Sequence, residues 1–177
     1  MSKAVNVALA RTVRAAVIRN GIQGVFASHL SRAGRTAQKL VIASPWITGD
    51  SQGGTLSRIA RIIKRRGIAT YVFTRPPKTE AHRSALNALA ACPSVELVFN
   101  ENLHAKVYAC LAPYPYGFGM LGSANLTSHS EELHEIGLVV LSGGGGDEIV
   151  KELAAFGLDY LRTRPDSQII KRLSIRR

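Results

Sequence analysis

The chain has 177 residues, 46% of them hydrophobic, which is enough apolar surface for one self-contained core. Lys and Arg number 23 against 12 Asp and Glu, and this net charge of +11 favours polyanionic partners, nucleic acid first and anionic lipid second. The composition excludes disordered, collagen-like and coiled-coil chains, and without an apolar run of about 18 residues no membrane span is predicted.

Helices and strands alternate in the first half of the predicted chain. Val5, Leu9, Val13 and Val17 recur four residues apart, which predicts a helix over 3–19 in an N-terminal helical segment, 1–37. The other elements of this half are, in order, a helix at 25–38, a buried strand at 40–43, a helix at 56–66, a strand at 68–74, a helix at about 80–91 and a strand at 95–99.

The second half is richer in strands. They are predicted at 104–111, 118–121 and 135–141, and a final helix over 147–162 contains Gly157, which weakens a helix. A basic tail, 164–177, is expected to be partly exposed. This order predicts an α/β sandwich with a mixed central sheet flanked by helices, in a single domain, 1–177.

The two cysteines, Cys92 and Cys110, have no Cys/His spacing that suits zinc. We expect both to be reduced, partly buried thiols in a cytoplasmic protein. Arg11, Arg14 and Arg19 interrupt the apolar start of the chain, so a secretory signal is not expected.

His104 and Lys106 are the first candidate catalytic residues. Two residues apart at the start of a predicted strand, they should share one face. A neutral imidazole can attack phosphorus, and a lysine ammonium suits the non-bridging phosphate oxygens. No Asp/Glu cluster suits a two-metal site, so we expect neither a metal nor another cofactor.

A small polar turn and a carboxylate complete the candidate set. Ser123 and Asn125 could donate hydrogen bonds to the same oxygens, and Gly122 would let the backbone approach the substrate closely. Glu135 could accept a hydrogen bond from the far nitrogen of His104; we favour it over Glu131 and Glu132 because it opens an apolar strand.

The strings HAKVY and GSANLT, followed by a glutamate, resemble the phospholipase D superfamily, and the upstream ASPWIT is similar to its first-strand segment. The resemblance covers about residues 38–160. It implies a phospholipase D-like fold and a two-step reaction through a covalent phosphohistidine, in which a second histidine protonates the leaving oxygen. Because the H-x-K element occurs once here, it also implies a homodimer in which His104 of each subunit meets the other.

The sequence departs from this pattern at two places. Leu111 stands where the family has an aspartate, and the stretch before Gly122 is four residues longer than usual. Trp46 and Arg75, each at a predicted strand end, are candidate substrate-binding residues, although packing and ordinary surface roles compete. The basic stretches RIIKRR at 61–66 and KRLSIRR in the tail are candidate backbone-binding patches or simply solvated faces.

Three functions remain in competition. The first is a metal-independent nuclease acting on DNA or RNA, favoured by the basic charge and the small size. The second is a phospholipid-acting phosphodiesterase of the same superfamily. The third is a nucleic-acid-binding module that keeps the fold without turnover, for which Leu111 is the argument.

Overall fold

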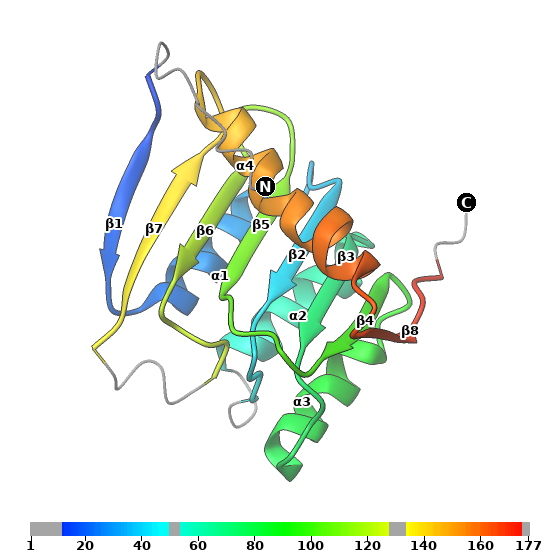
Figure 1. Cartoon of the computed structure of the whole chain (residues 1–177). Coiled ribbons are helices and arrows are strands. Elements are labelled where there is room, and N and C mark those ends of the chain that lie inside the picture. Colours follow the sequence, from blue (N-terminus) through cyan, green and yellow to red (C-terminus); the bar gives the residue numbers. More distant parts are fainter. Residues whose placement is uncertain (1–11, 50–53, 128–133, 175–177) are drawn as a thin grey trace.

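The computed structural model describes residues 12–49, 54–127 and 134–174. Its strands form one mixed sheet in the order β1-β7-β6-β5-β2-β3-β4-β8 (Figure 1). β2, β3 and β4 are parallel neighbours, and the other pairs are antiparallel. The strands are β1 Ala15–Arg19, β2 Lys39–Ala43, β3 Ala69–Thr74, β4 Val95–Asn100, β5 Val107–Leu111, β6 Phe118–Gly122, β7 Ile136–Leu141 and β8 Ser167–Lys171.

Helices cover both faces of this sheet. α1 (Ile22–Ala33), α2 (Thr55–Arg66) and α3 (Glu80–Ala90) lie behind it in Figure 1, and α4 (Gly146–Ala155) crosses the front. Each face has its own core cluster, one under α1, α2 and α3 and one under α4. The predicted α/β sandwich with a mixed central sheet is therefore confirmed.

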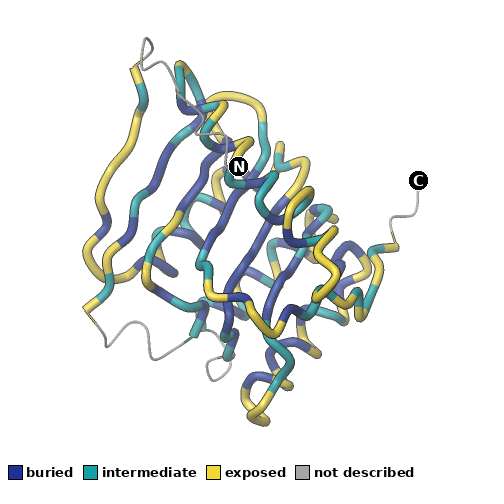
Figure 2. The backbone as a smooth tube through the Cα atoms, viewed as in Figure 1, coloured by how far each residue is buried: buried dark blue, intermediate teal, exposed yellow. Residues whose placement is uncertain are grey.

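Hydrophobic patterning explains the central elements. The run Leu40–Ala43 is fully buried because helices cover both faces of β2. In α2, Leu56, Ile59 and Ile63 recur at helical spacing and face the core. Figure 2 shows the consequence: the middle strands β2, β3, β4 and β5 are mostly buried, whereas β1 at the sheet edge is largely exposed.

The prediction for the N-terminus is wrong where the structure describes it. Residues 15–19 form strand β1, not the end of a helix over 3–19, and residues 1–11 lie outside the described part. Every residue of β1 pairs with β7, and Ile18 is the one residue of the strand that is buried. The four-residue spacing of valines and leucine predicted a helix here, but pairing with a strand distant in the chain overrides this local periodicity. The second predicted helix exists as α1, which begins three residues earlier and ends five residues earlier than 25–38.

Three boundaries in the second half also differ from prediction. β5 begins at Val107, so His104 and Lys106 precede the strand. The final helix gives way after Ala155 to a π-helical segment, Phe156–Tyr160, and a short 3₁₀ turn, Leu161–Thr163. The C-terminal tail, which we expected to be partly exposed, contains an additional strand, β8, which pairs with β4 and completes the sheet edge.

Both cysteines are free thiols, as predicted, but they are buried and not partly buried, and burial raises the pKa of Cys110 to about 12. Within the described ranges, no helix is long and apolar enough to span a lipid bilayer.

Candidate active site

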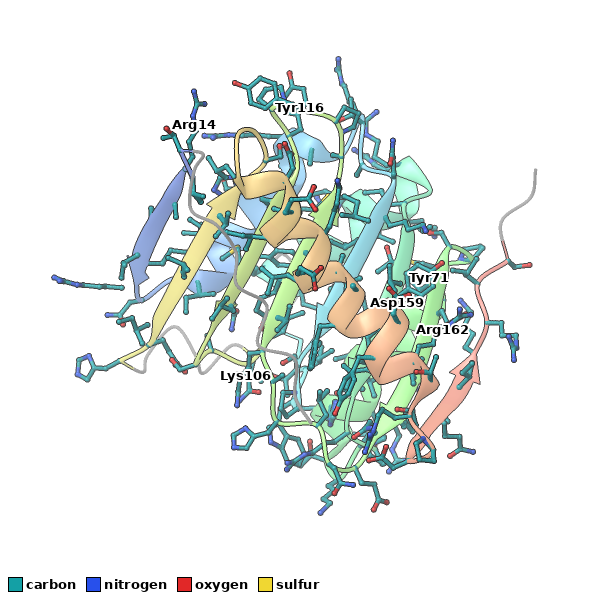
Figure 3. All side chains as sticks on the ribbon, turned by 45° about the horizontal axis from the view of Figure 1, so that its top comes forward. Arg14, Tyr71, Lys106, Tyr116, Asp159 and Arg162 are labelled. Atoms are coloured by element: carbon teal, nitrogen blue, oxygen red, sulfur yellow. The ribbon has the colours of Figure 1, made fainter. Side chains whose placement is uncertain are left out.

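One edge of the sheet gathers the predicted catalytic residues. β2 and β6 end at this edge, and β5 and β7 begin there, because Ala43 pairs with Val107 and Gly122 pairs with Gly137. The segments carrying the H-x-K element, the Gly-Ser turn and the glutamate therefore converge although they are far apart in sequence. Figure 3 shows Lys106 at this edge, opposite the edge with Tyr116 in the β5–β6 turn.

His104 and Lys106 contact each other directly. The Lys106 Nζ lies 3.1 Å from His104 Nδ1 and 3.0 Å from the His104 carbonyl oxygen. An ammonium only donates, so Nδ1 accepts, and a neutral ring in this arrangement carries its proton on Nε2. The predicted shared face is confirmed, although an extended segment ahead of β5 provides it. The Gly122 amide donates to the Lys106 carbonyl at 3.3 Å and joins this segment to the Gly-Ser turn.

Ser123 and Glu135 form the second pair at this edge. The Ser123 hydroxyl donates to the Glu135 carboxylate and accepts from the Ile136 amide at 3.1 Å. Within one copy of the chain the carboxylate thus contacts Ser123, whereas His104 Nδ1 contacts Lys106. The predicted hydrogen bond between Glu135 and His104 is therefore absent among the described residues. The Glu135 carboxylate accepts from Ser123 instead, at the end of the neighbouring strand β6.

Asn20 holds Glu135 in place, a role that sequence reasoning missed. Its side-chain oxygen accepts from the backbone amide of Glu135 at 2.9 Å, and the backbone amide of Asn20 donates to the Glu135 carbonyl, also at 2.9 Å. Asn20 and Gly21 both adopt left-handed backbone conformations, with φ of 58° and 64°. The Asn-Gly dipeptide is a turn signal that could have indicated this connection between β1 and α1.

Asn125 lies on a segment fixed from below. Gln23 of α1 donates to the Asn125 carbonyl at 2.8 Å, and the Ser44 hydroxyl accepts from the Leu126 amide at 3.0 Å. Tyr108 is fully buried beneath them and donates to the Ala124 carbonyl at 2.9 Å. Burial raises the pKa of Tyr108, so its hydroxyl stays a donor. The turn after β6 is therefore held rigidly at the edge of the sheet.

The space beside Gly122 is occupied by protein. A Cβ at this position would lie 2.6 Å from the Ile136 carbonyl oxygen and 2.9 Å from the Gly137 Cα. The glycine is thus required by the close approach of β7. Contact between Gly122 and substrate stays a prediction.

The two predicted substrate-binding residues serve the site differently. Arg75 donates from Nε to the Leu103 carbonyl at 2.8 Å and so anchors the backbone directly before His104. Trp46 packs against buried His82, with ring centroids 5.5 Å apart. Their contact with substrate stays a prediction, but Arg75 has a positioning role that its sequence context did not indicate.

A cavity of about 250 Å³ opens beside His104. The Tyr160 ring, 52% exposed, stacks on Phe156 with centroids 5.7 Å apart, and the Arg164 guanidinium lies 5.3 Å from the Tyr160 centroid. Tyr160 and Arg164 both line the cavity. An exposed aromatic ring with an arginine above it provides a surface on which a planar group can stack.

No family model and no curated protein matches the sequence. Solved structures do match the fold: Nuc, a phospholipase D family member of Salmonella typhimurium, is similar with a TM-score of 0.67 and 14% identity, over 91% of this chain and 100% of its own. The chain has a phospholipase D-like fold. NucT of Helicobacter pylori has a TM-score of 0.61 and 18% identity over 86% of this chain and 98% of NucT. Polyphosphate kinase of Porphyromonas gingivalis has a TM-score of 0.63 and 14% identity over 91% of this chain but 27% of the kinase.

The phospholipase D-like fold also explains the departure at Leu111. This residue ends β5 and pairs with Lys39 at the start of β2, so it lies at the sheet edge away from His104. Its half-buried side chain packs against the cluster under α4. An aspartate at position 111 would therefore not reach the candidate active site from this strand, and its loss removes no group from that edge.

Proposed function

We propose that this protein is a metal-independent phosphodiesterase that cleaves DNA or RNA through a covalent phosphohistidine on His104. The observation that carries the proposal is the convergence of the His104–Lys106 pair and the Ser123–Glu135 pair on one edge of a phospholipase D-like fold. Among the described residues, no group of three or more His, Cys, Asp and Glu is arranged to hold a metal ion. The proposed chemistry relies on imidazole, ammonium, hydroxyl and amide groups instead.

The contact between Lys106 and His104 Nδ1 defines the first step. For Nε2 to attack, it must hold a lone pair, so the ring proton must move to Nδ1 and Lys106 must release that nitrogen. A bound phosphodiester gives the ammonium a better acceptor in its non-bridging oxygens. Nε2 then forms a bond to phosphorus as the bond to the leaving oxygen breaks. Asn125 is proposed to donate to the oxygens that gain charge, and Ser123 is proposed to do so once its hydroxyl proton turns from Glu135 to the substrate.

A second imidazole has to protonate the leaving oxygen and later take a proton from the water that hydrolyses the P–N bond. Since the chain has one H-x-K element, we propose that His104 of a second copy supplies it. The surface beside the site supports this arrangement. Val17, Leu121 and Ile136 are 64%, 41% and 61% exposed. Val17 and Leu121 both pair with Leu138 of β7, two residues from Ile136, so the three side chains lie together on one face of the sheet. Such a patch next to Glu135 is suited to burial against an identical copy.

Nucleic acid is the proposed substrate because of charge and shape. The net charge of +11 favours a polyanion, and the cavity lined by Tyr160 and Arg164 lies where a base next to the attacked phosphate would fall. The phospholipid alternative would require an apolar acyl-chain site, whereas this cavity includes Asn102, Arg164 and Asp166.

Cleavage assays test the proposal directly. Purified protein is incubated with plasmid DNA, RNA and phosphatidylcholine, each with and without EDTA, beside His104→Ala and a matched His134→Ala control at another exposed histidine. We expect nucleic-acid cleavage that survives EDTA, disappears in His104→Ala and persists in His134→Ala. Loss of cleavage in EDTA contradicts the phosphohistidine mechanism, and cleavage of lipid alone contradicts the substrate. A strictly monomeric active enzyme in a sizing experiment contradicts the shared site.

A further inference from the structure

The net positive charge of the chain is concentrated in its first 79 residues. They contain 14 Lys and Arg and a single Asp, a net charge of +13, whereas residues 80–177 contain 9 Lys and Arg and 11 Asp and Glu, a net charge of −2. In the fold α1 and α2 come from the basic part and lie on one face of the sheet beside α3, while α4 lies on the other face. α1 and α2 contain no acidic residue, and α4, across the sheet, carries Asp147, Glu148 and Glu152.

The basic side chains on α2 line a groove against α1. Arg58, Arg61 and Arg65 occupy positions i, i+3 and i+7, so they share one face of the helix. Together with Arg66 of α2 and Ser31 of α1, they line a cavity of about 250 Å³. In the described part of the chain none of these four arginines has a carboxylate partner, unlike Arg83 and Lys151, which pair with glutamates. The groove therefore presents uncompensated guanidinium groups to solvent.

The groove is separate from the candidate active site. α2 ends at Arg66, just before β3 begins at Ala69, and β3 runs toward the catalytic edge, where Arg75 contacts the segment before His104. The C-terminal end of α2 is therefore at the opposite edge of the sheet. The cavity beside His104 and the α1–α2 groove share no lining residue.

We propose that the α1–α2 groove is a second binding site that takes the phosphate backbone of nucleic acid, independently of base sequence. The inference rests on the proposed function in taking nucleic acid as substrate. Arg58 to Arg65 spans about 10 Å at 1.5 Å per residue, the axial length over which one strand of a duplex presents about three phosphates. Guanidinium groups pair with phosphate oxygens through two parallel hydrogen bonds.

The same surface is poorly suited to a lipid membrane. Helices that lie on membranes expose large apolar side chains for insertion. In α2 the apolar residues Leu56, Ile59 and Ile63 face the core, and none of the exposed large hydrophobic residues in the described ranges belongs to α1 or α2. Charge without exposed apolar side chains favours nucleic acid.

Salt-dependent binding tests this site. Fluorescence anisotropy measures binding of a labelled 20-bp duplex between 50 and 300 mM salt, with all proteins in the His104→Ala background so that the duplex stays intact. The test variant combines Arg58→Gln, Arg61→Gln and Arg65→Gln. The control combines Arg83→Gln, Lys151→Gln and Arg172→Gln, which removes the same charge from other exposed positions.

Loss of three phosphate contacts should reduce the slope of log K against log salt by about 2.7, at about 0.9 per contact, and weaken binding roughly 500-fold at 0.1 M salt if affinities converge near 1 M. The control should keep the parent slope to within about one contact. Equal losses in both variants would show a bulk charge effect and overturn the site. Loss of binding to phosphatidylserine vesicles while duplex binding is unchanged would also overturn it.

Hydrolysis of bis(4-nitrophenyl) phosphate, measured in the native His104 background, separates this inference from the proposed function. The cavity beside His104 shares no lining residue with the α1–α2 groove, so the parent and the groove variant should turn this small diester over equally. If neither hydrolyses it or cleaves nucleic acid, the proposed function fails, and the anisotropy slopes still decide the groove. Selective loss of diester hydrolysis in the groove variant would overturn the separation of the two sites.

Discussion

Gly157 offers a test in which local propensity and tertiary packing predict opposite signs. It lies in the π-helical segment after α4, where Gly→Ala would ordinarily stabilise a helix by about 1 kcal/mol. A Cβ here, however, would lie 2.5 Å from Val41 Cγ1 and 2.9 Å from Phe73 Cε2. Carbon atoms pack best at about 3.5–4.0 Å, and both neighbours are fully buried in the sheet. Overpacking of this kind costs about 1–3 kcal/mol, which outweighs the gain in helix propensity, so we expect Gly157→Ala to lower the free energy of unfolding by up to about 2 kcal/mol.

Gly24 is the matched control for this substitution. It lies in α1 and is exposed, and a Cβ at its position would meet nothing within 4 Å. Gly24→Ala should therefore raise the free energy of unfolding by about 0.5–1 kcal/mol. Each variant adds one methyl group to a helical position, so their comparison isolates the effect of contact between that methyl group and the sheet.

Urea unfolding followed by circular dichroism measures both variants. The midpoint should move down for Gly157→Ala and up for Gly24→Ala, with unchanged m-values that justify the comparison. If Gly157→Ala stabilises the protein as much as Gly24→Ala does, the close packing of the π-helical segment on Val41 and Phe73 is wrong.

Four further predictions follow from the site and its surroundings. Arg75→Ala frees the backbone before His104, so in the proposed reaction kcat should fall at least about tenfold with little change in KM, and unchanged kinetics would exclude the positioning role. Burial lowers the pKa of His82 below 6.5, so on acidification the unfolded chain takes up this proton before the folded protein does. The contribution of His82 to stability is therefore complete above pH 6.5, and the free energy of unfolding should fall below that pH by up to about 1.4 kcal/mol per pH unit. Urea titrations at each pH should show a shallower fall in His82→Gln. Mixing native protein with His104→Ala under exchange should reduce activity as the square of the native fraction, whereas a linear decrease would mean that each chain works alone. Arg162→Met leaves buried Glu96 without its 2.6 Å partner and should cost about 2–3 kcal/mol in urea unfolding, and Glu96→Gln in the same chain should recover part of it.

The sequence predicted the parts of this molecule whose signals are local. The buried run at 40–43 and the amphipathic helix that ends at Arg66, before Gly67, appear where their patterns placed them, because burial on both faces or on one face leaves a direct pattern in the sequence. The edge strands β1 and β8 were missed because half-exposed strands carry little pattern, and their partners lie more than 60 residues away in the chain. Pairing with β7 and β4 decides their conformation.

The candidate site divides in the same way. Residue types and their order selected His104, Lys106, Ser123 and Glu135, and the fold brings their segments to one edge. The hydrogen-bond partners were beyond reach of the sequence, since they depend on which side chain lies nearest once the strands are aligned. Asn20 shows this best, because a turn asparagine 115 residues from Glu135 in the chain holds its backbone.

The pairing of Asn20 with Glu135 makes the outermost strand part of the machinery. β1 has a neighbour on one side only, and edge elements of this kind open locally at a smaller free-energy cost than the centre of a fold. Each time β1 detaches, the backbone of Glu135 loses both hydrogen bonds to Asn20, and its carboxylate is no longer held beside Ser123. If the protein has the proposed activity, mild heating should therefore abolish that activity before the whole fold unfolds, with hydrogen exchange at residues 15–20 rising in step with the loss.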